Sequence, residues 1–147
     1  MFHGSDRWVL LVLAAVLFVS VISYAERAMT VIDLRARLRL DIVDTEAERR
    51  LGLGGRNSLA RSDGMLFTFD TSGIYPFWMN GMRFPIDIVW IDRGIVKDIV
   101  TLHEPKDERT MPERHAPTSF ADRVLEINAG MAKELGLRPG VRVLLPE

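Results

Sequence analysis

The 147-residue sequence contains no cysteine. Disulfide bonds, thiolate zinc sites and a cysteine nucleophile are therefore excluded, but the compartment is left open, because disulfides are permitted and not required outside the cytosol. The sequence also lacks an excess of either charge, because it contains 19 basic and 20 acidic residues and has a net charge of −1. No overall field attracts nucleic acid or an anionic membrane, so we expect neither as a partner of the folded domain.

Familiar catalytic signatures are missing as well. The sequence has no G-x-S-x-G, no P-loop and no H-E-x-x-H, so the usual marks of hydrolases, nucleotide-binding proteins and zinc proteases are lacking. His103 and His115 stand near acidic residues in segment 103–119, but their irregular spacing and three prolines argue against a preformed metal cage. We expect no metal and no cofactor, and segment 103–119 is predicted to be a long exposed loop.

A long hydrophobic run lies at the N-terminus. Residues 8–22, WVLLVLAAVLFVSVI, follow Arg7 and contain Ser20 as their polar residue. This pattern is typical of a signal peptide, with Ala25 before a possible cleavage point. An uncleaved signal anchor is the alternative, because about 17 apolar residues is the short limit for spanning a bilayer. We therefore expect an exported chain, periplasmic or membrane-anchored and facing the extracytoplasmic side, with a leader over residues 1–25 and one domain over residues 26–147.

Most patterns after the leader have the period of strands. Apolar residues alternate with charged ones over residues 34–42, which predicts a strand with its arginines in water. Thr45 and Glu48 fit a capping box at the start of a short helix, and Asp92-Arg93-Gly94 is a hairpin signal between two apolar runs. A second helix near residues 131–135 and a last strand over 141–145 complete the pattern. We predict a mostly β fold: a single compact β-barrel or sandwich-like domain of about seven strands with two short helices.

A series of motifs runs through the domain in a fixed order: Glu48-Arg49-x-x-Gly52-Leu53-x-x-Arg56-x-x-Leu59, Gly64-Met65-Leu66-Phe67-x-Phe69, Phe77-Trp78-Met79, Pro85-x-Asp87-Ile88-x-Trp90-Ile91-Asp92, and Val124-Leu125-Glu126 with Ala129-Gly130. This series resembles the domain of unknown function 192 family, over roughly residues 31–145. The resemblance implies a compact, mostly β barrel or sandwich and supplies no activity. Gly54 and Val141 depart from the family, which often has Met and Asp there.

The run FWMNGMRFPIDIVWID, residues 77–92, places a carboxylate, Asp87, inside a strand whose two faces are both apolar. A buried carboxylate requires a partner or takes up a proton. Candidate cations are Arg49, Arg56 and Arg83, and we favour Arg56 because it follows a glycine-rich turn. The pair either ties a loop to the sheet or forms the floor of a pocket.

Three functions fit these residues. The first is a non-catalytic small-ligand-binding or accessory module of the cell envelope, with the hypothetical ligand-binding residues Arg49, Arg56, Trp78, Asn80, Asp87 and Glu126. The second is an enzyme that acts on envelope polysaccharide or peptide through Asp87 or Glu126, which requires two acid or base groups in one cleft. The third is a structural or interaction module whose partner, not identified by the sequence, meets loop 103–119. We favour the first, with Trp78 lining a cleft and Trp90 in the core.

Overall fold

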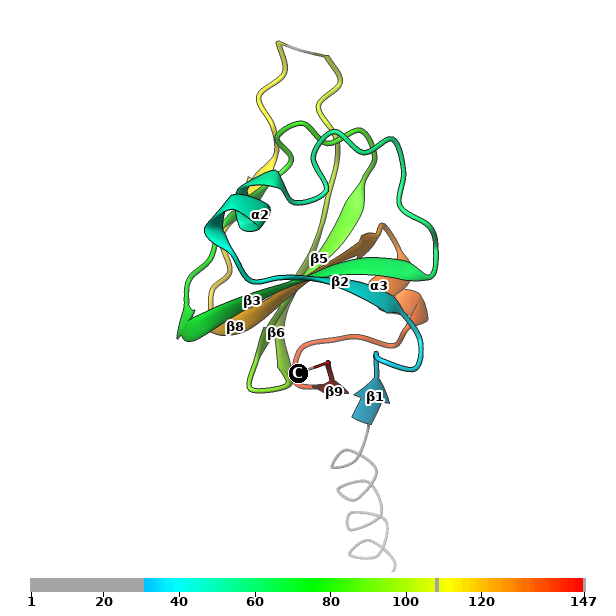
Figure 1. Ribbon diagram of the computed structural model, residues 1–147, viewed down its shortest axis with the longest axis vertical. Coiled ribbons are helices and arrows are strands. Elements are labelled where there is room, and N and C mark those ends of the chain that lie inside the picture. The colour runs from blue at the N-terminus through cyan, green and yellow to red at the C-terminus, as the bar shows by residue number, and fades with distance from the viewer. Residues whose placement is uncertain (1–30, 108, 147) are drawn as a thin grey trace, which may run out of the picture. The chain divides into compact units, whose positions relative to one another are not determined.

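The computed structural model describes residues 31–107 and 109–146. The expected leader, residues 1–25, lies outside these ranges, so the signal peptide and its cleavage stay predictions. Neither helix within the described ranges is long and apolar enough to cross a membrane. This part of the chain forms nine strands and two helices (Figure 1): β1 Val31–Asp33, β2 Arg39–Val43, α2 Glu46–Leu51, β3 Asp63–Gly73, β4 Phe77–Trp78, β5 Ile86–Asp92, β6 Ile95–Leu102, β7 Arg114–His115, β8 Ala121–Asn128, α3 Met131–Glu134 and β9 Arg142–Leu144.

Seven of the described strands form one sheet, in the order β1-β9-β6-β5-β8-β3-β2, and β4 pairs separately with β7. The β1–β9 and β2–β3 pairs are parallel, whereas the other pairs are antiparallel. β1 and β2 are the two edges of the sheet, yet only residues 34–38 connect them in sequence. The sheet therefore curls into a half-barrel, and the predicted mostly β, barrel-like fold is confirmed.

The sheet has two buried faces, each with its own apolar cluster. On the first, which we call the α3 face, the sheet packs against α3 and the turn between β1 and β2, through side chains that include Leu34, Leu66, Val89, Ile91, Leu125, Ile127 and Leu135. On the second, the β4 face, it packs against the turn after α2 and the segment around β4, through side chains that include Leu53, Met65, Phe67, Met79, Met82, Ile88 and Trp90. Trp90 is fully buried and its indole N–H donates to the Tyr75 carbonyl at 2.8 Å, as predicted.

The predicted strand over residues 34–42 is wrong in its first half, because β2 begins only at Arg39. Leu34 and Leu38 are both buried, and the Leu38 N–H donates to the Leu34 carbonyl at 2.9 Å, so residues 34–38 form a helix-like turn. A separation of four residues places side chains on one face of a strand and also on one face of a helical turn. The alternation of residues 34–42 therefore did not distinguish the two.

Two local predictions are confirmed in detail. Thr45 caps α2, and the Thr45 and Glu48 side chains each bond the other's backbone N–H, as a capping box requires. Arg93 and Gly94, with φ of 50° and 73°, form the two-residue turn between β5 and β6. The pairing then slips by one residue after Ile91, so that Thr101 and not Val100 lies opposite Asp87.

Segment 103–119 leaves the sheet after β6, and its described parts before β7 extend beyond the main sheet (Figure 1). It is not wholly irregular, because β7 pairs with β4 and places Arg114 opposite Trp78. The two histidines of the segment contact different acidic residues: His103 lies 3.4 Å from Glu113, and His115 lies 3.0 Å from Asp98. Among the described residues, no group of three or more His, Asp or Glu side chains is arranged to hold a metal ion.

Candidate ligand-binding site

Asp87 lies on the α3 face and is 2% exposed. Its carboxylate accepts a hydrogen bond from the Thr101 hydroxyl at 2.7 Å and another from the Ala132 backbone N–H, in the first turn of α3, at 2.9 Å. The predicted pairing of Asp87 with Arg56 is wrong, because Arg56 donates to Asp41 at 3.2 Å. Asp87 thus ties α3 and β6 to the centre of the sheet.

A hollow of about 570 Å³ opens beside Asp87, between β6 and the segment from Gly130 to Pro139. Its lining includes Thr101, Lys133 and Arg138. Both carboxylate oxygens of Asp87 already accept hydrogen bonds from the protein, so this carboxyl is satisfied without a ligand. Asp87 is therefore better explained as a structural tie than as a ligand-binding group.

Glu126 is the second buried carboxyl group, and it lies on the β4 face. Ile88 of β5 is directly opposite Glu126, whereas Asp87 is opposite Ile127, so the two carboxyls point to opposite sides of the sheet. Glu126 is 5% exposed, and within the described chain its Oε2 atom is buried with no hydrogen-bond partner. Asp87 and Glu126 cannot act together in one cleft, which removes that pair from the enzymatic hypothesis.

Burial sets the ionisation of Glu126. The loss of hydration raises the pKa of Glu126 from 4.5 to about 8, and the positive charge of Arg56 opposes this shift only in part. At neutral pH the side chain is thus mostly an uncharged carboxylic acid, which donates one hydrogen bond and accepts others.

A cavity of about 40 Å³ lies over Glu126. Its lining comes from α2 and the following turn, from β3, from β4 with the segment after it, and from β8: Arg49, Arg50, Leu51, Gly52, Leu53, Gly54, Phe67, Phe77, Trp78, Asn80, Met82 and Glu126. We call this the Glu126 pocket. One water molecule needs about 10–15 Å³ of such space, so the pocket has room for a small polar group such as a hydroxyl, amide or carboxyl.

Glycines keep the Glu126 pocket open. Gly52 ends α2 with φ of 50°, and a Cβ atom at this position would lie 3.9 Å from Glu126 Oε2 and 3.5 Å from the Phe67 ring. At Gly54 a Cβ would come within 3.0 Å of the Leu51 carbonyl oxygen and 3.4 Å of that of Asn80. Side chains at these positions would fill the space or push the turn away. The glycine-rich turn therefore lets backbone approach a buried carboxyl closely.

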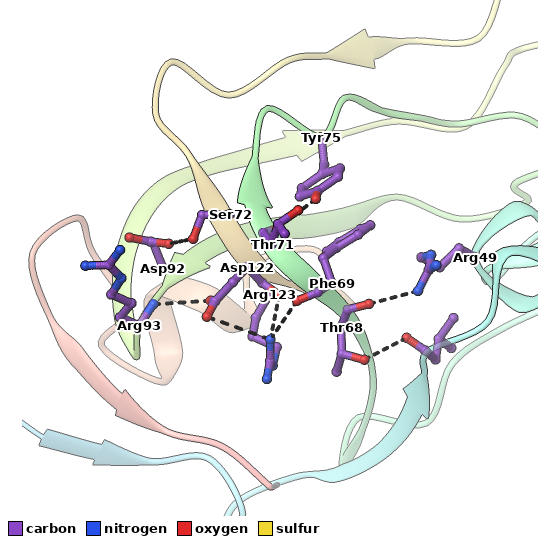
Figure 2. A network of polar contacts seen from close by, with 11 residues as sticks. Arg49, Thr68, Phe69, Thr71, Ser72, Tyr75, Asp92, Arg93, Asp122 and Arg123 are labelled. Atoms are coloured by element: carbon purple, nitrogen blue, oxygen red, sulfur yellow. Dashed lines mark hydrogen bonds and ion pairs between the residues drawn. The ribbon is translucent and has the colours of Figure 1, made fainter.

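Arg49 contributes a positive charge to the wall of the pocket. Its Nη1 atom donates to the Thr68 carbonyl at 2.9 Å and to the Asp44 carbonyl, and its guanidinium lies 5.2 Å from the centre of the Phe69 ring. Figure 2 shows the side chain reaching β3 beside Thr68 and Phe69. No carboxylate within the described ranges forms an ion pair with Arg49. Its charge is therefore held in place by backbone oxygens and the Phe69 ring.

The charge of Arg56 affects the pKa of Glu126. Asp41 of β2 is opposite Met65 of β3, and Met65 is opposite Glu126, so Asp41 and Glu126 share the β4 face two strands apart. Arg56 pairs with Asp41 and also acts on the charge of Glu126. The arginine expected to neutralise Asp87 thus lies near the other buried carboxyl.

The structure brings four of the six candidate residues together in the pocket, namely Arg49, Trp78, Asn80 and Glu126. Arg56 lies nearby, and Asp87 lies on the far side of the sheet. Sequence reasoning missed the contributions of Gly52, Phe67, Phe77 and Met82. The sequence did carry a signal for Glu126, because it stands in the apolar run VLEI just as Asp87 stands in IDIVWI.

Trp78 also borders a second hollow. Its side chain is 60% exposed, and together with Phe77 it lines both the Glu126 pocket and a cavity of about 220 Å³ whose other walls are Pro76 and Arg114. β4 is therefore a shared wall between two hollows, with the indole of Trp78 accessible to solvent.

Comparison with known proteins supports the resemblance seen in the motifs. The family DUF192, described as "Uncharacterized ACR", matches residues 28–145. The chain belongs to this family. None of the curated proteins matches the chain.

Two solved structures resemble this DUF192 domain. A protein of unknown function from Novosphingobium aromaticivorans DSM 12444 is 28% identical, with 71% of this chain and 73% of that chain covered and a TM-score of 0.61. A protein from Sinorhizobium meliloti 1021, provisionally described as a transcription regulator, is 30% identical, with 71% and 79% covered and a TM-score of 0.63. Family and neighbours thus agree on the fold and leave the activity undefined.

Proposed function

We propose that this DUF192 chain is an extracytoplasmic module that binds a small ligand without transforming it, and that the Glu126 pocket is its binding site. The hydrophobic run of residues 8–22 supports export. The observation that carries the binding function is Glu126 itself, whose Oε2 atom has no hydrogen-bond partner among the described residues and borders a cavity.

A buried polar atom without a partner costs a protein stability, typically about 1–3 kcal/mol. Phe67 and Met82 line the same pocket, so an apolar side chain in place of Glu126 would pack against them without this loss of stability. A polar group kept beside a cavity at such a cost is a candidate for contact with a ligand. At neutral pH the protonated Glu126 donates its hydrogen to an acceptor on the ligand, and Asn80 and Arg49 supply further donors at the wall.

A DNA-binding role has less support. The net charge of −1 gives the chain no overall attraction for phosphates. The description as a transcription regulator applies to the Sinorhizobium meliloti protein and is not transferred to this chain. We propose no nucleic acid partner, and a membrane contact only through the N-terminal segment.

The test is a thermal-shift screen of the full-length chain against envelope saccharides and short peptides. A ligand of the Glu126 pocket raises the Tm of the wild type and fails to raise that of Glu126→Met, which keeps the length of the side chain but cannot form hydrogen bonds of comparable strength. Glu134→Met, at an exposed position of α3, is the matched control and responds like the wild type. A ligand that shifts wild type and Glu126→Met equally would place the binding site elsewhere and refute the proposal.

An enzymatic role is the second candidate, because an acid with a pKa of about 8 is suited to protonate a leaving group at neutral pH. Asp41, on the same face two strands away, is the available second carboxyl. If the protein is an enzyme of this kind, Glu126→Gln lowers turnover of a cleavable envelope saccharide by at least about 100-fold. Unchanged turnover in that variant would exclude it.

A further inference from the structure

We infer that the Glu126 pocket and the hollow beside Arg114 form one continuous site, and that this site binds an acidic saccharide whose ring stacks on Trp78 and whose carboxylate is bound by Arg114. The inference rests on the proposed function, to which it adds the class of ligand.

The shared wall is the first reason. Phe77 and Trp78 line both hollows, so the Glu126 pocket and the hollow beside Arg114 lie next to each other on β4. The pocket of about 40 Å³ accepts a single polar substituent, and the hollow of about 220 Å³ is large enough for more of the ligand. The ligand is therefore longer than one functional group and is anchored at one end.

The indole of Trp78 is the second reason. It is a large aromatic side chain that is 60% exposed, between two hollows, in a strand of only two residues. A pyranose ring has a flat face of C–H groups that packs on an aromatic ring, and small hydroxyl or acetamido groups that project from its edge. A ring on Trp78 would thus place one projecting group in the Glu126 pocket.

The charges on either side of Trp78 are the third reason. Arg114 is directly opposite Trp78 across the β4–β7 pair, and its side chain forms no ion pair or hydrogen bond within the described ranges. On the other side, Arg49 lines the Glu126 pocket without a carboxylate partner among the described residues. Glu126 itself is largely uncharged at neutral pH. The site is therefore positive, which favours an anion over a neutral or cationic ligand.

A peptide ligand is less consistent with these walls. Extended peptides gain affinity by adding a strand to an exposed sheet edge. β4 and β7 contain two residues each, so they offer a very short edge at this site. A saccharide needs no such edge.

The experiment measures the affinity of the full-length chain for two disaccharides by calorimetry: one that contains glucuronate, and its counterpart that contains glucose. We expect the wild type to bind the acidic disaccharide at least about tenfold more tightly than the neutral one. In Arg114→Gln this preference disappears while affinity for the neutral disaccharide is retained, and Arg114→Lys restores part of it. Arg37→Gln, which removes the same charge at the exposed turn between β1 and β2, retains the preference.

Equal affinity for the two disaccharides in the wild type would overturn the inference, and the proposed function would stand if Glu126→Met still weakens both. A preference unaffected by Arg114→Gln would also overturn it. If neither disaccharide binds while an acidic peptide binds in a Glu126-dependent manner, the saccharide assignment is wrong and the binding site is right. If binding of every probe is unaffected by Glu126→Met, the proposed function itself fails.

Discussion

The two buried carboxyl groups of this domain occupy neighbouring strands and differ in almost every other respect. Asp87 points to the α3 face, where a hydroxyl and a backbone N–H bind its two oxygens. Glu126 points to the β4 face, where Oε2 finds no partner among the described residues and a cavity begins. Two acids in apolar strands thus have opposite explanations, one as a tie that holds the fold and one as a group kept at a cost to it. The two carboxyls are both buried, and they differ in whether the protein supplies hydrogen-bond partners for them.

The largest effect that tests this contrast is the pH dependence of stability. Because the pKa of Glu126 is about 8 when folded and 4.5 ordinarily, the folded chain holds a proton that the unfolded chain releases between these values. The contribution of the protonated Glu126 to stability is therefore complete below pH 4.5 and is lost as pH rises through about 8, by on the order of 3–5 kcal/mol. Denaturant unfolding across pH 4.5–9 checks this, and Glu126→Gln removes the decline. An identical slope in wild type and variant would contradict the assigned ionisation.

Next in size is the loss of the Asp87 tie. Asp87→Ala leaves the Ala132 N–H and the Thr101 hydroxyl without their acceptor, so the free energy of unfolding should fall by about 2–4 kcal/mol. Chemical denaturation measures the change. A double-mutant cycle with Thr101→Val should show coupling, whereas a cycle with Arg56→Gln should be additive. Coupling to Arg56 instead would revive the pairing that the structure replaces.

The opposite sign is expected for the second carboxyl. Glu126→Met replaces an acid that lacks an internal partner, in the described chain, with an apolar side chain of similar length beside Phe67 and Met82. We expect the free energy of unfolding at pH 7 to rise by about 1–3 kcal/mol. Denaturant titration of the two proteins provides the measurement. A decrease of that size would mean that Glu126 supports the fold as Asp87 does.

The smallest effect concerns Arg56, which lowers the pKa of Glu126 through its charge. Arg56→Gln should therefore raise that pKa further, by less than about one unit, because the arginine is exposed and already paired with Asp41. NMR titration of the Glu126 carboxyl carbon follows the shift. Arg37→Gln should leave the titration in place.

The fold was largely predictable because its signals are local. The capping box at Thr45 and the turn at Arg93-Gly94 each need only a few neighbouring residues, and both formed as predicted. The faces of β5 followed from alternation alone: Val89 and Ile91 pack on one side and Ile88 and Trp90 on the other. Residues 34–38 show the limit, because their spacing fits both a strand and a turn.

The site was predictable only in part, because its partners depend on register. A regular hairpin continued from the turn would place Val100 opposite Asp87, and the slip of one residue in the pairing places Thr101 there instead. The sequence of β6 does not indicate this shift in register, so an arginine was the reasonable prediction for the partner of Asp87. Glu126 was a candidate, but its lack of a partner in the described structure could be seen only once Gly52 and β4 had been placed around it.

The pairing of β1 with β9 also affects how the domain forms. Val31 lies opposite Arg142, so the first described strand can be paired only after a segment more than 100 residues further along the chain has been made. Contacts between such distant residues carry a large loop-closure entropy and slow the folding of β proteins. Until β9 arrives, β1 and the apolar side chains beneath it have no cover. The domain should therefore depend on being kept unfolded, or held by a chaperone, until β9 has been synthesised.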